Sequence, residues 1–201
     1  AVDGDGRRKP LLYALRAANA QRLATIQPHS DGLSLTVVND SDEEWNAHFT
    51  VTRRAFDGGM LAIETWDALI PARGVARHRI GVDITTPTDP RAELIRATSS
   101  SLKADWFFEE ARDSALPEAA TVVTARPSDD GWTVDVTAET IVRDVTLLVD
   151  RVDAAAEVSD ALVTLLPGES VQFTVRGATG AEASSFADPL VLRTMNDLVR
   201  R

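Results

Sequence analysis

The chain has 201 residues, 44% of them hydrophobic, and carries 21 Lys and Arg against 31 Asp and Glu, a formal net charge of -10. This length accommodates two domains of roughly 100 residues as readily as one larger domain. An acidic chain lacks the basic face that attracts nucleic acids and anionic membranes, so neither is an expected partner. No run of about 18 apolar residues indicates a membrane span, and no charged, apolar and small-residue series marks a signal peptide.

The residue types that are missing or rare also limit the kinds of site and the compartments expected for the protein. The chain contains no cysteine, which excludes disulfides and thiolate metal sites, fits the cytoplasm and leaves secretion open. Only two of the basic residues, Lys9 and Lys103, are lysines, and this Arg bias suggests a GC-rich bacterial genome. The chain begins with Ala rather than Met, which favours a cut or processed piece of a longer protein.

The first predicted element is an amphipathic helix over residues 10–26. Apolar residues recur there at steps of three and four, Pro10 suits the first turn of a helix, and Pro28 stands just past its end. A lone helix of this length is marginal in water without a packing surface. We therefore expect its apolar face, with Leu12, Leu15 and Leu23, to dock onto the first sandwich or to form a dimer contact.

After residue 29 the period of the apolar residues changes from 3.6 to 2. Alternating runs at 33–38 and 47–52 are separated by a polar turn, and further extended runs follow along the chain. Short strands at this spacing, with turn residues between them, are typical of an antiparallel sandwich. The remaining strands of this first β region are expected at 61–70, 75–82, 92–98 and 103–109.

A polar stretch with Pro117 reads as a linker, and the strand pattern then begins again. Trp132, Val134 and Val136 share one face of a cleanly alternating strand, and the turn PGES at 167–170 separates two later strands. The fold class is therefore predicted as mainly β, with two immunoglobulin-like antiparallel β-sandwiches preceded by one N-terminal α-helix. The expected strands are 121–125, 132–138, 142–149, 158–166 and 171–175, and a strand or short helix is expected at 189–199.

Four segments together resemble a known family in their order and spacing. They are residues 6–16 (GRRKPLLYALR), 33–40 (LSLTVVND), 103–108 (KADWFF) and 165–169 (LLPGE). In this order they resemble the C-terminal part of glycoside hydrolase family 2 β-mannosidases, and the resemblance covers essentially the whole chain.

The resemblance implies a division of the chain into three parts. Residues 1–28 would be the loop and helix that end a (β/α)8 catalytic barrel, residues 29–112 a first immunoglobulin-like sandwich, and residues 113–201 a second one. The parent enzyme would remove terminal non-reducing β-D-mannose residues with retention of configuration. Retaining chemistry needs two carboxyl groups about 5–5.5 Å apart, and in this family both are glutamates upstream of this region.

No catalytic, cofactor-binding or metal-binding residue is predicted in the chain itself. The acidic clusters lie in or beside predicted turns, where carboxylates are solvated or bond their own backbone. The segment DGDG at 3–6 fails as a calcium loop because Arg7 and Arg8 replace a ligand and the glycine, and Ala14 replaces the final Glu. His29, His48 and His78 have no metal-binding spacing.

Four residues are the candidates for contact with a missing domain or a sugar. Arg7, Arg8 and Lys9 are expected to bridge to carboxylates of the catalytic barrel. Trp66 shares its strand face with Glu64 and is expected to be partly exposed, as a contact with the barrel or as a platform for a sugar ring. Trp45, Trp106 and Trp132 are interpreted as core residues.

The sequence thus favours a non-catalytic accessory fragment that supports the barrel of an exo-β-mannosidase and needs no cofactor. Its expected partner is the upstream barrel of the same polypeptide, with mannosides reached only through the full enzyme. An autonomous carbohydrate-binding sandwich is one alternative. The same region of another family 2 glycosidase, an exo-β-glucosaminidase or a β-galactosidase, is another, and a protein-binding sandwich has no positive feature in its favour.

Overall fold

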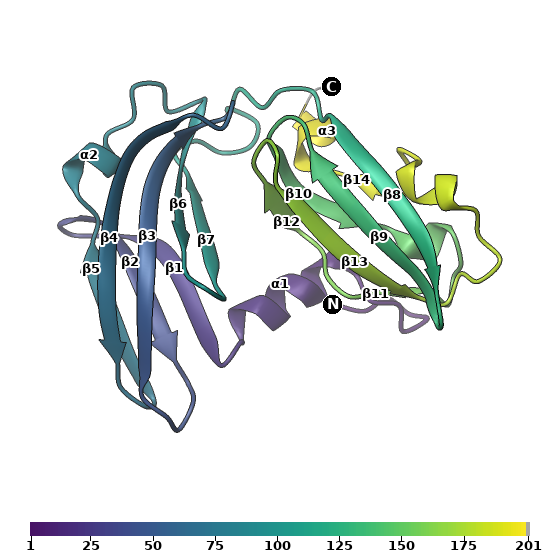
Figure 1. The fold of residues 1–201 in the computed structure, drawn as a ribbon, viewed down its shortest axis with the longest axis horizontal. Coiled ribbons are helices and arrows are strands. Elements are labelled where there is room, and N and C mark those ends of the chain that lie inside the picture. Colours follow the sequence, from purple (N-terminus) through teal and green to yellow (C-terminus); the bar gives the residue numbers. More distant parts are fainter. Residues whose placement is uncertain (200–201) are drawn as a thin grey trace. The chain divides into compact units, whose positions relative to one another are not determined.

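The computed structural model describes residues 1–199 and shows two compact units (Figure 1). The middle unit comprises residues 17–115, whereas the terminal unit combines residues 1–16 with the chain from Leu116 onward. The segment 1–28, predicted as one piece, is therefore divided between the two units at residue 16. Every strand pair in both units is antiparallel, which confirms the mainly β fold with immunoglobulin-like sandwiches and one N-terminal helix.

The middle unit packs a three-stranded sheet, in the order β1-β2-β5, on a four-stranded sheet, in the order β4-β3-β6-β7. Leu35 and Val37 from the first sheet meet Phe49, Val51 and other fully buried residues of the second, because alternate residues of each strand point inward. The elements of this unit are β1 (Arg22–His29), β2 (Gly32–Asn39), β3 (Trp45–Ala55), β4 (Met60–Ile70), β5 (Gly74–Arg79), α2 (Val82–Thr85), β6 (Glu93–Thr98) and β7 (Lys103–Phe107).

The terminal unit repeats this plan with sheets in the orders β12-β10-β14 and β11-β13-β9-β8. Its core joins Trp132, Val134 and Phe173 to residues of the smaller sheet, and Tyr13 from the N-terminal helix belongs to the same core. The elements are α1 (Pro10–Ala18), β8 (Thr121–Ser128), β9 (Gly131–Ala138), β10 (Val142–Leu147), η1 (Val149–Arg151), β11 (Glu157–Val158), β12 (Val163–Leu165), β13 (Ser170–Arg176), η2 (Ala183–Ala187), β14 (Leu192–Arg193) and α3 (Met195–Val199).

The N-terminal helix is shorter than predicted. Helix α1 ends at Ala18, and residues 22–29 form β1, which pairs with β2 from Arg22 to His29. In this strand Ala24 and Ile26 are buried and neighbouring residues are less so, which is the two-residue period. The expected apolar face of Leu12, Leu15 and Leu23 is divided, because Leu12 packs with Tyr13 against the core of the terminal unit and Leu23 lies in β1.

Other boundaries differ where the backbone leaves the extended conformation. The strand expected over 75–82 ends at Arg79, and residues 82–85 form α2. The strand expected over 158–166 is interrupted between β11 and β12, where Leu162 has a φ of 62°. The closing segment contains both a short strand, β14, and a helix, α3. None of the helices within residues 1–199 is long and apolar enough to cross a membrane.

Candidate functional site

The basic residues singled out from the sequence lie in an ordered N-terminal loop, residues 1–9, which we call the strap. Asp3 organises it, because its Oδ1 accepts the backbone N–H groups of Asp5 at 3.1 Å and Arg7 at 3.0 Å. Its Oδ2 accepts hydrogen bonds from Arg7 Nε at 2.9 Å and lies 3.2 Å from Lys9 Nζ. Gly6, with a φ of 80°, supplies the left-handed turn that closes the loop.

The protonation of the strap follows from these bonds. Desolvation of the Asp3 carboxylate raises its pKa, but hydrogen bonds from the Arg7 backbone, the Lys9 ammonium and the Asp5 backbone outweigh this effect and lower the pKa to about 2. Hydrogen bonds to Asp150 and then Asp3 raise the pKa of Lys9 above its ordinary value. Asp3 and Lys9 are therefore both ionised at neutral pH, and their pairing holds the two ends of the strap together.

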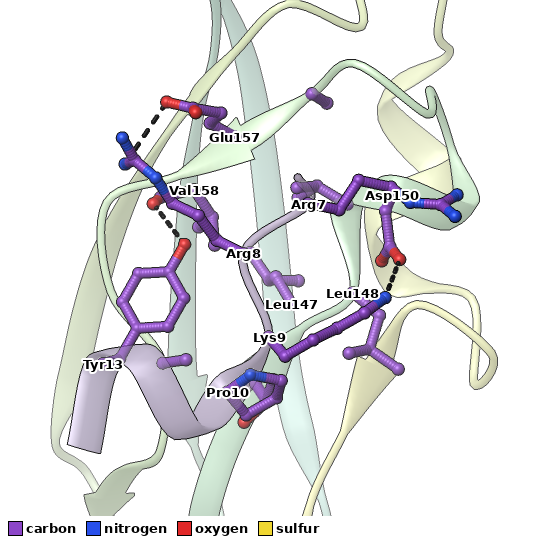
Figure 2. Close-up of a pocket in the computed structure, with 14 residues that line it drawn as sticks. Arg7, Arg8, Lys9, Pro10, Tyr13, Leu147, Leu148, Asp150, Glu157 and Val158 are labelled. Carbon is purple, nitrogen blue, oxygen red and sulfur yellow. Dashed lines mark hydrogen bonds and ion pairs between the residues drawn. The ribbon is translucent and has the colours of Figure 1, made fainter. Parts of the chain in front are cut away.

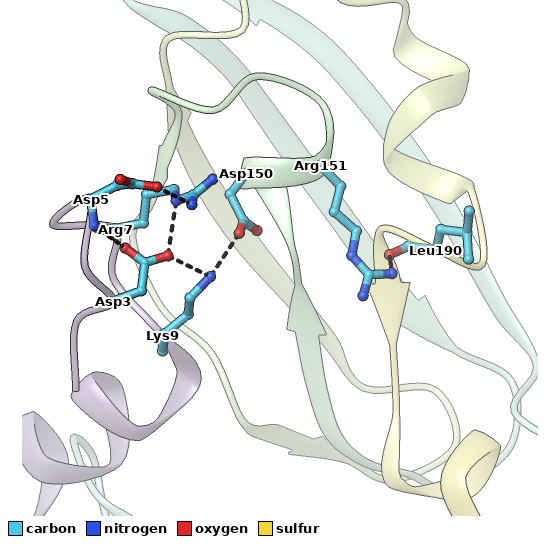
Figure 3. A network of polar contacts seen from close by, with 7 residues as sticks. All are labelled: Asp3, Asp5, Arg7, Lys9, Asp150, Arg151 and Leu190. Atoms are coloured by element: carbon cyan, nitrogen blue, oxygen red, sulfur yellow. Dashed lines mark hydrogen bonds and ion pairs between the residues drawn. The ribbon is translucent and has the colours of Figure 1, made fainter.

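The three basic side chains reach carboxylates of their own unit (Figures 2 and 3). Lys9 Nζ lies 3.0 Å from Asp150 Oδ2, and Arg8 Nη1 lies 3.3 Å from Glu157 Oε2. Arg7 pairs with Asp3 and Asp5. The structure thus gives all three residues partners within the terminal unit, and their contact with an upstream domain stays a prediction.

Helix α1 continues the strap and is anchored by Tyr13. The side chain is 4% exposed, and its hydroxyl donates a 2.9 Å hydrogen bond to the Val158 carbonyl (Figure 2). Arg16 lies over the tyrosine ring at 5.0 Å and donates to the Ser159 carbonyl and the Asp160 carboxylate. Burial is the main cause of the raised pKa of Tyr13. The phenol is therefore a neutral structural donor.

The pocket between the strap, α1 and the loop after β10 is too small for a sugar. Figure 2 shows Arg8, Lys9 and Tyr13 around it with Leu147 and Val158. Its volume of about 30 Å³ has room for roughly one or two water molecules, whereas small-molecule sites commonly measure about 300–1,000 Å³. This pocket is therefore a narrow gap where the strap and α1 pack against the rest of the terminal unit.

Trp66, the fourth candidate, lies in β4 of the middle unit, with two rings and a hydrogen-bonded carboxylate beside it. Its indole stacks on Phe49 at 5.9 Å and on His78 at 5.2 Å. His78 Nε2 lies 3.0 Å from Glu64 Oε1, and the same carboxylate accepts the Gly81 backbone N–H at 3.0 Å. Trp66 is partly buried in the packed edge of the sandwich, and its contact with a sugar or a barrel stays a prediction.

The aromatic residues as a group offer little to a carbohydrate. Sugar-binding sites of the stacking type present the open face of an aromatic ring to the pyranose. Every Trp, Tyr and Phe of the chain falls within the described residues, and none of them is exposed. Among residues 1–199, no three His, Asp or Glu side chains gather in a group that could hold a metal ion.

Sequence reasoning identified the strap cations and missed their partners. Asp3, four residues before Arg7, is a local signal that could have been found. Asp150 and Glu157 lie far along the chain and carry no signal that one sequence reveals. Tyr13 was overlooked although it is the one polar-tipped residue on an apolar helix face, which is a hint of a buried hydroxyl with a partner.

Comparison with known proteins places this geometry in a family context. Residues 116–198 match the Ig-fold domain family Ig_mannosidase. A β-D-mannosidase from Dictyoglomus thermophilum has a similar structure, with a TM-score of 0.75 at 17% identity over 96% of this chain and 23% of that one. An exo-chitosanase from Amycolatopsis orientalis matches with a TM-score of 0.59 at 14% identity over 97% of this chain and 28% of that one. No curated protein matches the sequence significantly.

These matches cover different parts of the chain. The family match covers the sandwich of the terminal unit without α1 or the strap. At 14–17% identity the structural matches show the fold of nearly the whole chain. The chain spans about a quarter of the length of each enzyme. Residues 116–198 thus match the mannosidase-type Ig-fold domain family, and nearly the whole chain shares its fold with parts of a β-D-mannosidase and an exo-chitosanase.

Proposed function

We propose that the chain is the non-catalytic C-terminal accessory region of a retaining exo-β-mannosidase, which hydrolyses terminal non-reducing β-D-mannose residues. Its two sandwiches would support a (β/α)8 barrel contributed by the upstream part of the same polypeptide. The observation that carries the proposal is the mannosidase-type Ig-fold match over 116–198, within a fold shared with a β-D-mannosidase over 96% of this chain.

The described side chains support an accessory role. The polar residues that converge at the strap form ion pairs with one another around a space of about 30 Å³, which leaves no room for a substrate between them. The two carboxylates of a retaining mechanism would have to come from another domain. The strap and α1 would then be the connection through which that domain joins the sandwiches.

One alternative has a specific observation in its favour. The match to the exo-chitosanase, at a TM-score of 0.59, is compatible with a parent that cleaves β-D-glucosaminides. An autonomous carbohydrate-binding module is less well supported, because no aromatic ring is exposed in a chain whose aromatic residues are all described. A dimer through α1 would use Leu11 and Leu15, which are 58% and 46% exposed.

The test compares the full-length gene product with the 201-residue chain on aryl β-D-mannoside and aryl β-D-glucosaminide. We expect the full-length protein to hydrolyse the mannoside and the 201-residue chain to hydrolyse neither substrate. Activity on the glucosaminide alone would select the alternative parent. Hydrolysis by the 201-residue chain itself would refute the accessory role.

A further inference from the structure

An apolar groove on the terminal unit has no role in the strap or in either core. It measures about 580 Å³ and is lined by Pro10 of α1 and by Leu148, Leu162, Leu190, Met195 and Leu198. The side chains of Leu190, Leu198 and Leu162 are 63%, 49% and 36% exposed. Apolar side chains grouped around a hollow of this size are typical of an interaction surface rather than of scattered surface leucines.

The backbone holds one wall of the groove in an unfavourable conformation. Leu162 has a φ of 62°, in the left-handed region that a leucine rarely adopts. Its N–H is bonded to Thr146 Oγ1 at 3.3 Å, another residue of the groove. A strained residue that presents an apolar side chain outward points to use of that side chain by a partner.

Three charged residues line the groove, the cations Arg151 and Arg193 and the anion Asp144, in a chain whose net charge is -10. Arg151 Nη1 donates to the Leu190 carbonyl at 2.6 Å (Figure 3), and Arg193 Nη1 donates to the Pro189 carbonyl at 3.1 Å. Both guanidiniums are therefore held in place by carbonyl oxygens, and within residues 1–199 neither has a carboxylate partner. They are oriented cations available to an acidic group of a partner.

The strap fixes where the preceding polypeptide meets this unit. The Lys9 backbone N–H donates to the Ala1 carbonyl at 3.0 Å, and Lys9 is followed directly by Pro10 on the groove wall. Lys9 is also joined to Asp150, next to Arg151 of the groove. Any residues that precede Ala1 therefore arrive beside the groove, and about three quarters of the matched β-D-mannosidase lies outside the part this chain covers.

The geometry points to the upstream part of the same polypeptide as the occupant of this groove, through an apolar segment that carries an Asp or Glu for Arg151 and Arg193. This inference rests on the proposed function, since it needs a domain encoded before Ala1.

Hydroxyl-radical footprinting tests the proposal, because it reports the solvent accessibility of individual side chains. We expect oxidation of Leu162, Leu190, Met195 and Leu198 to fall severalfold in the full-length protein relative to the 201-residue chain. Equal oxidation of these groove residues in both proteins would overturn the proposal.

A pair of matched variants gives a second readout. Leu190→Gln with Leu198→Gln alters the groove, whereas Leu61→Gln with Leu69→Gln alters two comparably exposed leucines of β4 in the middle unit. We expect neither pair to change the melting temperature of the 201-residue chain. In the full-length protein only the groove pair should lower it, by a few degrees. Equal shifts from both pairs, or none from the groove pair, would count against the groove.

Three further outcomes separate this proposal from its alternatives. A 201-residue chain that dimerises in sedimentation, with the dimer abolished by the groove pair, would assign the groove to a second copy and overturn the proposal. A full-length protein that hydrolyses aryl β-mannoside with an unprotected groove would keep the proposed function and reject this surface. A protected groove in a full-length protein without glycosidase activity would keep this surface as the docking site and reject the proposed function.

Discussion

At the scale of single residues, Tyr13 joins the N-terminal segment to a core built mostly from residues beyond 130. Its ring belongs to the same buried cluster as Trp132 and Val158, and its hydroxyl donates to the buried carbonyl of Val158. Asp3 has the corresponding role in the polar part of the connection, because one carboxylate receives two backbone N–H groups and two cationic side chains. Asp3 thus orders the strap internally, while Tyr13 and the pairs of Lys9 with Asp150 and Arg8 with Glu157 join this segment to the rest of the unit.

Replacing Tyr13 tests both parts of its contact. Tyr13→Phe leaves the Val158 carbonyl without its donor and should cost about 1 kcal/mol of unfolding free energy. Tyr13→Ala also leaves a cavity in the core and should cost about 3 kcal/mol. Calorimetric unfolding of the 201-residue chain measures both values. The control is Leu11→Ala on the exposed side of α1, which should change stability by less than about 0.5 kcal/mol; a Tyr13→Ala cost as small as this would contradict the assignment.

The ionisation of Asp3 makes the strap sensitive to acid. Because its pKa is lowered from 3.8 to about 2 in the folded chain, the carboxylate contributes stability above pH 4, and that contribution is lost as the pH falls from 4 to 2. The melting temperature of the wild type should thus fall more steeply than that of Asp3→Asn across this window. A carboxyl-carbon NMR titration gives the pKa directly, and an unperturbed value near 3.8 would disprove the proposed hydrogen bonds.

At the scale of elements, the strap and α1 complete a sandwich that begins more than a hundred residues later. The family match starts at residue 116, yet a buried residue of that sandwich comes from α1. The spacing of apolar residues can therefore predict correctly that a segment is a helix or a strand without showing which part of the chain it packs against. The borders of a recurrent domain need not coincide with the borders of its core.

Deletion of residues 1–18 should destabilise the terminal unit even though the matched domain stays whole. The loss should exceed that of Tyr13→Ala, because the ion pairs of Lys9 with Asp150 and Arg8 with Glu157 are removed as well. Scanning calorimetry measures the difference, and a synthetic peptide of residues 1–18 should restore part of it by binding in trans. An unchanged melting temperature after the deletion would show that the strap is not part of the fold.

Strands with a clear two-residue alternation were predictable, and the failures have identifiable causes. At 22–26 the same apolar residues satisfy two periods: Leu23 and Ile26 fit a helix, while Ala24 and Ile26 fit a strand. Pairing with β2 decided for the strand, and Pro28 is tolerated because β1 lies at the sheet edge. The break at Leu162 had no signal, because leucine, unlike glycine or asparagine, gives no warning of a positive φ.

The candidate site was predictable only in part for a similar reason. The basic residues 7–9 stand out in an acidic chain, but their carboxylate partners Asp150 and Glu157 are far away in sequence. Pairing across such a distance is set by the fold, and a single sequence holds no record of it. Trp66 was correctly expected to be only partly buried, whereas its stacking on His78 depends on how two sheets meet at their edges.

At the scale of the whole molecule, one unit is built from two segments that lie far apart in the sequence. The middle unit is one continuous segment, residues 17–115, but the terminal unit needs residues 1–16 and the last strands together. The Lys9 to Asp150 and Tyr13 to Val158 contacts join positions 141 and 145 residues apart. Contacts between such distant positions form slowly because a long loop must close first.

Refolding should therefore reach the middle unit first. Trp132 is the one tryptophan in the terminal unit, where it packs against Phe186, and the other three lie in the middle unit. In stopped-flow refolding, the fluorescence phase that disappears in Trp132→Phe should be slower than the remaining phases. A Trp132 phase as fast as the others would show that closure of the terminal unit does not limit folding.

The strap also determines what happens when the chain is nicked. Because residues 1–16 belong to the terminal unit, the chain leaves that unit after residue 16 and re-enters it at residue 116. A single proteolytic cut between these positions leaves two polypeptides, and each contributes residues to the same core, Tyr13 from one and Trp132 from the other. The protein can thus lose the continuity of its backbone without losing its N-terminal piece.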